Sequence, residues 1–297
     1  MPSIEIKNKS ARDKMNAALK AGSKGDKHAS PQLKAVKPVL AENVKQSEES
    51  PKEFLDLKRA LVPQMFSANF TKEFYLTEVH RPRFIKGSAL FFNQPYLEAL
   101  TRTPWYAVPL FWGPIVAWHL LSAYNDFSKS TFEASIGVGL IITGLFAWTL
   151  LEYVFHRFLF HMEKALPSRQ WAYSLHFLLH GVHHFLPMDR MRLVMPPALF
   201  IILSVGPYFL IRSLAGQKYL NPLYSGAVTS YIAYDLCHYF FHHGASRFSI
   251  VNMMKSYHMA HHYKDYNKGY GVTSKLWDIV FHTTFDYSKV QLNYKSS

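Results

Sequence analysis

Three long stretches of this sequence contain no Asp, Glu, Lys or Arg, and they limit the possible folds more than any other feature. They cover residues 105–124, 134–151 and 193–211. About twenty apolar residues in a helix span the hydrocarbon core of a bilayer. In lipid, only helices and closed barrels satisfy their own backbone hydrogen bonds. A weaker stretch, residues 219–234, is the expected fourth span. The sequence therefore predicts an all-α integral membrane protein with about four transmembrane helices.

The charges between these stretches predict the orientation in the membrane. Residues 125–133 hold one Lys and two acids, whereas the longer loop 152–192 carries five cations: Arg157, Lys164, Arg169, Arg190 and Arg192. Short cytosolic loops collect Lys and Arg, so both termini and this long loop are expected in the cytosol. Arg212 and Lys218 are in mild conflict with this orientation. Arg190 and Arg192 are interpreted as topology signals, with lipid headgroup binding as the alternative.

Composition divides the chain into four parts. Residues 1–53 contain no Phe, Trp or Tyr and are expected to form a disordered, Lys-rich cytosolic tail without a signal peptide. Residues 54–104 are expected to be an interfacial amphipathic segment, 105–286 a membrane domain with a cytosolic helical cap, and 287–297 a tail. The net charge of +13 follows the loops, which argues against a nucleic-acid partner. The single cysteine, Cys237, excludes a disulfide framework.

Twelve of the sixteen histidines lie between His156 and His262, near the cytosolic ends of the predicted spans. Residues three or four apart lie on one face of a helix. Three sets have this spacing: His180 with His183 and His184, His238 with His242, and His258 with His261 and His262. Imidazole is the commonest protein ligand of transition metals. The clusters therefore predict a metal centre with more than one ion.

Other histidines do not fit this spacing. His243 should point away from whatever His238 and His242 bind, because five residues correspond to about 140° on a regular helix. His156 and His161 are also five apart, which implies either two different metals or a break in the helix near Phe160. His176 is expected to support a ligand rather than to bind metal. The isolated histidines are expected to be solvated or hydrogen-bonded: His28, His80, His119 and His282.

The ligand types indicate the kind of metal chemistry. Zinc hydrolases usually present three ligands, an open position and a carboxylate base. Here about ten histidines accompany few acids, and Glu152, Asp235 and Asp265 are expected to be the acids nearest the centre. An all-imidazole pair of ions suits redox-active iron that activates O₂. A metal transporter is the alternative from another class, but it would carry its histidines inside the spans.

The order of these motifs resembles the membrane fatty acid hydroxylase superfamily, which includes sterol desaturases and carotenoid hydroxylases. The motifs are HxxxxH, HxxxHxxHH, HxxxHH and HxxHH. The surrounding sequence is more similar to the fatty acid 2-hydroxylases, in particular HGVHHFLPMDRMRLVMPP from His180, YDLC before His238, YHMAHHY from Tyr257, and WD at Trp277. The similarity covers about residues 66 to 285.

This resemblance implies an enzyme of the endoplasmic reticulum membrane that hydroxylates C2 of the long or very long acyl chain of ceramide or another sphingolipid, with the acyl carrier left open. It implies a dimetal centre, with iron in the active enzyme and zinc as an alternative occupant after isolation, that uses O₂ and electrons from cytochrome b5 and its NADH-dependent reductase. Because the sequence has no His-Pro pair of a fused cytochrome b5, a separate donor is expected, attracted by the Lys-rich tail. A sterol or sphingoid-base oxidase is the alternative. The implied catalytic ligands are His156, His161, His180, His183, His184, His238, His242, His258, His261 and His262.

Overall fold

The computed structural model describes residues 54–285, so the tails predicted for 1–53 and 287–297 lie outside the described residues. The described part contains helices and no strand. The helices are α3 (Leu61–Ser67), α4 (Lys72–Val79), α5 (Pro95–Thr101), α6 (Ala107–Phe127), α7 (Thr131–Val154), the π-helix η1 (Phe155–Phe160), α8 (Gln170–His176), the π-helix η2 (Phe177–Gly181), α9 (Val182–Phe185), α10 (Pro197–His243), α11 (Ser249–Tyr263) and α12 (Leu276–Val280). The predicted all-α class is confirmed for this part of the chain.

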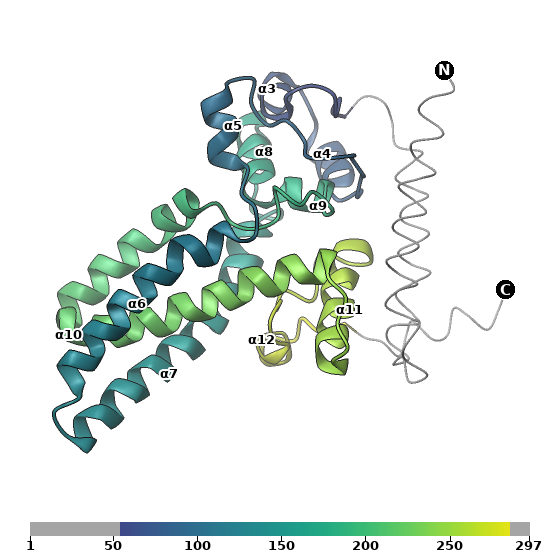
Figure 1. Ribbon diagram of the computed structural model, residues 1–297. Helices are drawn as coiled ribbons and strands as arrows, with labels where there is room; N and C mark the ends of the chain where they lie inside the picture. Colours follow the sequence, from purple (N-terminus) through teal and green to yellow (C-terminus); the bar gives the residue numbers. More distant parts are fainter. Residues whose placement is uncertain (1–53, 286–297) are drawn as a thin grey trace, which may run out of the picture.

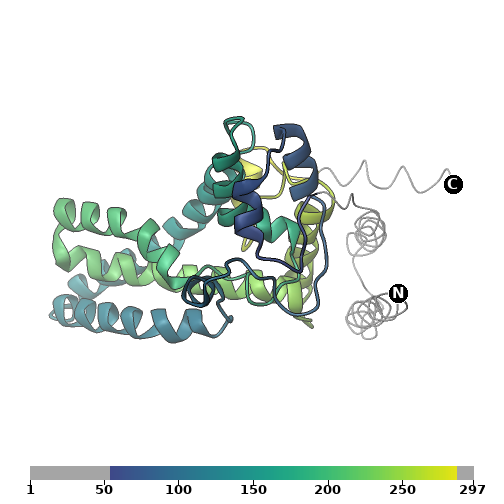
Figure 2. The same ribbon diagram turned by 90° about the horizontal axis from the view of Figure 1, so that it is seen from above.

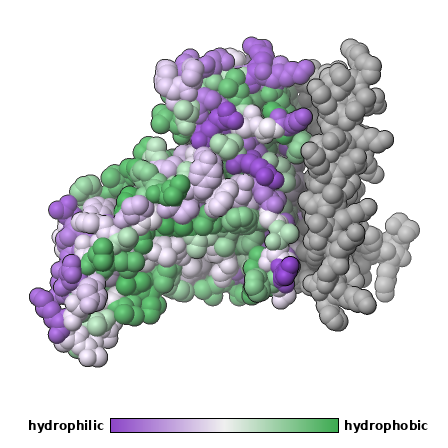
Figure 3. All heavy atoms as spheres, in the orientation of Figure 1, coloured by the Kyte–Doolittle hydropathy of each residue, from purple (hydrophilic) through white to green (hydrophobic). Residues whose placement is uncertain are grey.

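The three long helices, α6, α7 and α10, lie side by side and form an elongated body, and the short helices gather at one end of it (Figures 1 and 2). Each long helix is long and apolar enough to cross a membrane. Their outward faces carry large apolar side chains such as Leu121, Ile142 and Phe209, and hydrophobic residues spread over this body in Figure 3. Such a surface suits contact with lipid rather than water.

The helix α10 contains the last apolar stretch and most of the one before it. Its backbone leaves the helical conformation at Gly216, where φ is +81° and ψ is 165°. A positive φ of this kind is easily adopted only by glycine. The two parts of α10 consequently run out and back along the elongated body (Figure 1). The expected number of four spans stays a prediction, because α10 counts as one of three candidate membrane helices in the described part.

Two glycines permit α7 and α10 to pack at backbone contact. A methyl group built on Gly226 would lie 2.1 Å from the carbonyl oxygen of Ile141, and one on Gly144 would lie 2.1 Å from that of Leu223. No side chain fits at such distances, so the two helices touch as small-residue pairs in membrane proteins do.

Replacing Gly226 by alanine is expected to force α7 and α10 apart. Overpacking of this kind costs about 1–3 kcal/mol of stability, and more where backbone must move. The melting temperature of the purified protein in detergent should fall clearly. Gly206→Ala is the matched control on the same helix, because nothing lies within 4 Å of its added methyl group. Equal melting temperatures for the two variants would contradict this packing.

The short helices form a cap with its own apolar core. This core contains the side chains of Tyr75, Tyr173, Phe177 and Phe185, from α4, α8, η2 and α9. A second core runs between the long helices and α11. Residues 54–104 supply α3, α4 and α5, and the buried Tyr75 shows that part of this segment packs inward. Its expected position at the membrane interface stays a prediction.

Arg192 joins the cap to the loop that precedes α10. Its guanidinium is buried, forms an ion pair with Glu98 of α5, and donates to the carbonyl oxygen of Ala89 at 2.9 Å. It also lies over the ring of Phe91, with 3.8 Å between the guanidinium carbon and the ring centroid. The Glu98 carboxylate in turn accepts from the backbone N–H of Phe91 at 2.9 Å. Arg192 therefore has a structural role in addition to the topology signal expected from the sequence.

Candidate metal centre

All ten histidines of the predicted ligand set are buried at the junction between the long helices and the cap. They form two groups of five, and within each group the candidate ligand atoms lie within 4.8 Å of one another. The first group is His156, His161, His180, His184 and His261, and the second is His183, His238, His242, His258 and His262. The groups adjoin, since the ring centroids of His184 and His262 are 4.4 Å apart. The arrangement offers two neighbouring metal sites.

The π-helix η1 explains why His156 and His161 belong to one group despite their spacing of five. A π-helix has hydrogen bonds from residue i to i+5, so it aligns residues five apart. The backbone N–H of His161 donates to the carbonyl oxygen of His156 at 3.0 Å, and the helix ends there. The ring centroids of the two histidines are 5.0 Å apart. Of the two expectations for this pair, the structure has the change of helix near Phe160, and both histidines lie in one candidate group.

Spacing of four keeps histidines in one group, whereas spacing of three divides them. His180 and His184 share the first group, and His258 and His262 share the second. His183 lies in the second group, although His180 and His184 lie in the first. Likewise, His261 lies in the first group, although His258 and His262 lie in the second. Two of the three shared faces predicted from the sequence therefore supply ligand candidates to both groups, whereas His238 and His242 both belong to the second group. His243 belongs to neither group in the described part.

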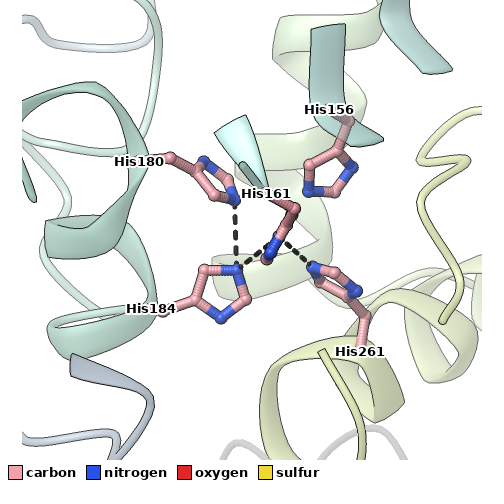
Figure 4. A group of neighbouring side chains, drawn as sticks. All are labelled: His156, His161, His180, His184 and His261. Atoms are coloured by element: carbon pink, nitrogen blue, oxygen red, sulfur yellow. Dashed lines mark hydrogen bonds between the residues drawn. The ribbon is translucent and has the colours of Figure 1, made fainter. Parts of the chain in front are cut away.

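The imidazoles of the first group point their Nε2 atoms toward one another (Figure 4). His184 Nε2 lies 3.1 Å from the Nε2 atoms of both His161 and His180, and His261 Nε2 lies 2.9 Å from that of His161. In the second group, the Nε2 pair of His238 and His183 is 2.9 Å apart, as is the pair of His242 and His258. Two ligand nitrogens at right angles on an ion, each about 2.1 Å from it, are about 3.0 Å apart. These spacings therefore fit adjacent ligands of a bound ion.

Hydrogen bonds at Nδ1 show that several Nε2 atoms of the first group carry no proton. His156 Nδ1 donates to the carbonyl oxygen of Tyr270 at 2.5 Å, and His261 Nδ1 donates to that of Lys268 at 2.7 Å. His161 Nδ1 donates to the carboxylate of Glu163 at 2.9 Å. A neutral imidazole with its proton on Nδ1 has a lone pair on Nε2. Lone pairs that face each other repel unless a cation lies between them, so the residues present fit a metal ion.

Burial also favours the neutral form of these imidazoles that binds metals. It lowers the pKa of each of the following side chains, which lie outside the membrane helices: His161, His180, His183, His184, His258, His261 and His262. A buried imidazolium is unfavourable because charge is costly in an apolar environment. The Nε2 of His156 is buried and has no hydrogen-bond partner, which also suits a ligand atom.

The acid closest to the centre is one that the sequence did not single out. Glu163 contacts His161, whereas Glu152 binds Thr273 through hydrogen bonds of 2.8 and 3.0 Å. Asp235 accepts from Tyr231 at 3.2 Å. The expectation that Glu152, Asp235 and Asp265 are the nearest acids was therefore wrong. The available signal was the position of Glu163, two residues after His161.

Two further histidines surround this carboxylate. His80 Nε2 lies 3.3 Å and His176 Nε2 lies 3.4 Å from Glu163 Oε1. His176 Nδ1 also shares a hydrogen bond of 2.6 Å with the Tyr75 hydroxyl. His176 therefore lies beside the first group without belonging to it, and the supporting role expected for it stays a prediction. His80 was grouped with the isolated histidines, and its position beside the centre was missed.

An apolar cavity of about 340 Å³ ends at both histidine groups. His180 of the first group and His183 and His238 of the second line one part of it. The remaining wall is largely apolar and includes Leu178, Leu193, Leu199 and Ile202. The first turns of α10, at the cap end of the long helices, contribute to this wall. The cavity can hold an apolar chain with one of its carbons beside the metal sites.

Comparison with known proteins gives consistent results. The fatty acid hydroxylase family model matches residues 141–283. The ceramide very long chain fatty acid hydroxylase scs7 of Schizosaccharomyces pombe is 45% identical over 77% of this chain and 65% of its own length. The corresponding Saccharomyces cerevisiae protein is 44% identical, and 58% of its length is covered. The chain thus spans less than two thirds of these two relatives.

Other comparisons cover nearly the whole of the matched protein. A dihydroceramide fatty acyl 2-hydroxylase of Arabidopsis thaliana is 37% identical, with 77% of this chain and 92% of the relative covered. A solved structure of full-length scs7p, in which only the hydroxylase domain is visible, aligns with a TM-score of 0.73 at 42% identity. It covers 83% of this chain and 89% of that chain. On these similarities, the chain belongs to the fatty acid hydroxylase family.

Proposed function

We propose that this chain is a membrane hydroxylase that uses O₂ to hydroxylate C2 of a very long acyl chain in ceramide or a related sphingolipid. The observation that carries this proposal is the apolar cavity that ends at two adjoining groups of five buried imidazoles. The relatives named as ceramide and dihydroceramide fatty acyl hydroxylases support the same lipid class. All ten histidines of the two groups are the proposed metal ligands.

Two iron ions, when bound, would supply the redox chemistry that splits O₂. One oxygen atom enters the C2–H bond, and the other leaves as water with two electrons and two protons. A cytochrome b5-type donor and its NADH-dependent reductase are the proposed source of electrons. Zinc is expected to occupy the same ligands in protein isolated without added iron, because it binds imidazole well. The endoplasmic reticulum membrane, with both termini in the cytosol, is the proposed location.

The contribution of the protein itself is to orient the substrate. The apolar side chains that α10 contributes to the cavity wall can hold the acyl tail. The exposed apolar side chains on the outer side of this helix suit contact with lipid. The polar end of an amphiphile then stays near the cap, and the carbons next to it lie beside His180, His183 and His238. The apolar wall also excludes water from the reacting carbon. A carbon close to the carbonyl group is therefore the expected position of attack.

Expression in cells that lack their own acyl 2-hydroxylase tests this function. Mass spectrometry of the sphingolipids should show 2-hydroxy acyl chains only when the chain is present. New oxygen in sterols or in the sphingoid base, without 2-hydroxy acyl chains, would contradict the proposal and favour the sister activities of the family. No change in lipids together with metal accumulation in the cells would instead favour a transporter.

A further inference from the structure

The two histidine groups differ in what holds their imidazoles. In the first group, His156, His161 and His261 each donate an Nδ1 proton to an oxygen, with lengths of 2.5, 2.9 and 2.7 Å. In the second group, the Nδ1 atoms of three imidazoles are buried and have no hydrogen-bond partner among the described residues: His242, His258 and His262. His180 and His184 are the exceptions in the first group, since neither makes a hydrogen bond through Nδ1 among the described residues. Ring orientation is thus fixed by hydrogen bonds mainly in the first group.

Glu163 is the one of these three acceptors that carries a charge. It is 7% exposed and contacts His161 at 2.9 Å. Hydrogen bonding of a ligand imidazole to a carboxylate fixes the ring and increases its ability to donate electrons to a metal. The two backbone carbonyl acceptors fix ring orientation without adding negative charge. A carboxylate at this position also offsets the positive charge of an ion held by neutral imidazoles.

Imidazoles from two other parts of the chain also lie next to the Glu163 carboxylate. His80, which ends α4, and His176, the last residue of α8, approach the same Oε1 at 3.3 and 3.4 Å. His80 is fixed by a hydrogen bond from its Nδ1 to the carbonyl oxygen of Leu76 at 2.9 Å. Its ring stacks on Tyr266, with centroids 3.5 Å apart. His80 and His176 thus crowd Glu163 from two other segments, while His161 is its hydrogen-bond partner among the three imidazoles.

We propose that Glu163 is a positioning residue that keeps the Nε2 of His161 directed into the first group and makes that group the tighter of two unequal metal sites. The second group lies open to the cavity through His183 and His238, whereas the first contributes only His180 to its wall. The more weakly held ion then lies on the substrate side. This inference rests on the proposed metal centre, and it concerns metal binding rather than turnover.

Metal release from the purified full chain in detergent tests the inference. The protein is loaded with Zn²⁺, and an excess of a chelating dye reports release over time. Two phases of one ion each are expected. Glu163→Gln should accelerate the slow phase about 10- to 100-fold, the usual effect of losing a partner of a metal ligand. The fast phase should not change.

Three variants assign and control the phases. His156→Ala should remove the slow phase, and His242→Ala should remove the fast phase, because each loses a ligand candidate of one group. Glu152→Gln is the matched control, since Glu152 is 4% exposed and binds Thr273 rather than a histidine. Both phases should be unchanged in this control. If the Glu163→Gln variant cannot be loaded with the slowly released ion, the Glu163→Asp variant should recover part of the slow phase, because it keeps the carboxylate.

The outcomes separate this inference from the proposed function. Equal acceleration of both phases by Glu163→Gln, or an unchanged slow phase, would overturn the positioning role while leaving the metal centre intact. A folded Glu163→Asp variant that shows no slow phase of release would also overturn the positioning role. A wild-type chain that is folded and binds no metal would overturn the metal centre and this inference together.

Discussion

His261→Ala is expected to abolish hydroxylation while the protein still folds and inserts into the membrane. His261 Nε2 lies 2.9 Å from that of His161, and its own Nδ1 is fixed by the carbonyl oxygen of Lys268. Removing this imidazole leaves the first group with four members. Loss of a partner one step removed from a metal typically costs 10- to 100-fold, so loss of a ligand should exceed about 100-fold. Product formation per mole of purified protein is the measurement.

His243→Ala is the matched control for this loss. His243 follows His242 directly in the sequence, but among the described residues it belongs to neither histidine group. It should retain most of the wild-type activity. Wild-type activity in His261→Ala, or equal losses in the two variants, would contradict the assignment of His261 to the metal centre.

Leu199→Trp is expected to block the cavity and to reduce activity on very long acyl chains at least about 10-fold. Leu199 lines the cavity near the start of α10, and the cavity volume of about 340 Å³ leaves little room for an indole beside an acyl chain. Overpacking a filled space displaces its occupant or its walls. The defect should grow with chain length, and metal content should stay at the wild-type level. Turnover of acyl chains of increasing length measures this effect.

Ile201→Trp controls for the introduction of tryptophan into the same helix. Ile201 is 41% exposed on the outer face of α10 and does not line the cavity. Its activity should be unchanged for every chain length. If Leu199→Trp turned over very long chains as well as Ile201→Trp, the cavity would not be the acyl site.

The elongated body could be predicted from the sequence because its physical cause is local. The charge-free stretches at 105–124 and 134–151 became α6 and α7, with ends that differ by a few residues. The last two stretches were predicted as separate helices. The structure has them in α10 on either side of Gly216, whose positive φ produces the bend. A glycine between two apolar stretches was the available signal.

The ten ligand candidates could also be identified from the sequence, but their division into two groups could not. For His156 and His161, a regular helix of 100° per residue was assumed, whereas the structure has the π-helix η1. An inserted residue of this kind is common at functional sites and has no marker in composition. It moves His161 onto the face of His156, where regular spacing would separate them.

Glu163 and His80 were missed because their roles depend on contacts between distant segments. His80 reaches Glu163 from the end of α4, 83 positions earlier in the chain. The sequence shows that Glu163 follows His161 closely, but many acids follow histidines without touching them. Only the packing of the cap against the long helices brings His80, His161 and His176 around one carboxylate.

The source of the oxygen atom in the product tests the proposed hydroxylase activity most directly. Purified protein loaded with iron is supplied with a ceramide that has an unmodified very long acyl chain, a reduced cytochrome b5-type donor and ¹⁸O₂. We expect one ¹⁸O atom in a hydroxyl group at C2 of the acyl chain, with no label when His261 is replaced by alanine. An oxygen atom that derives from water, or a hydroxyl at another position of the lipid, would contradict the proposed activity.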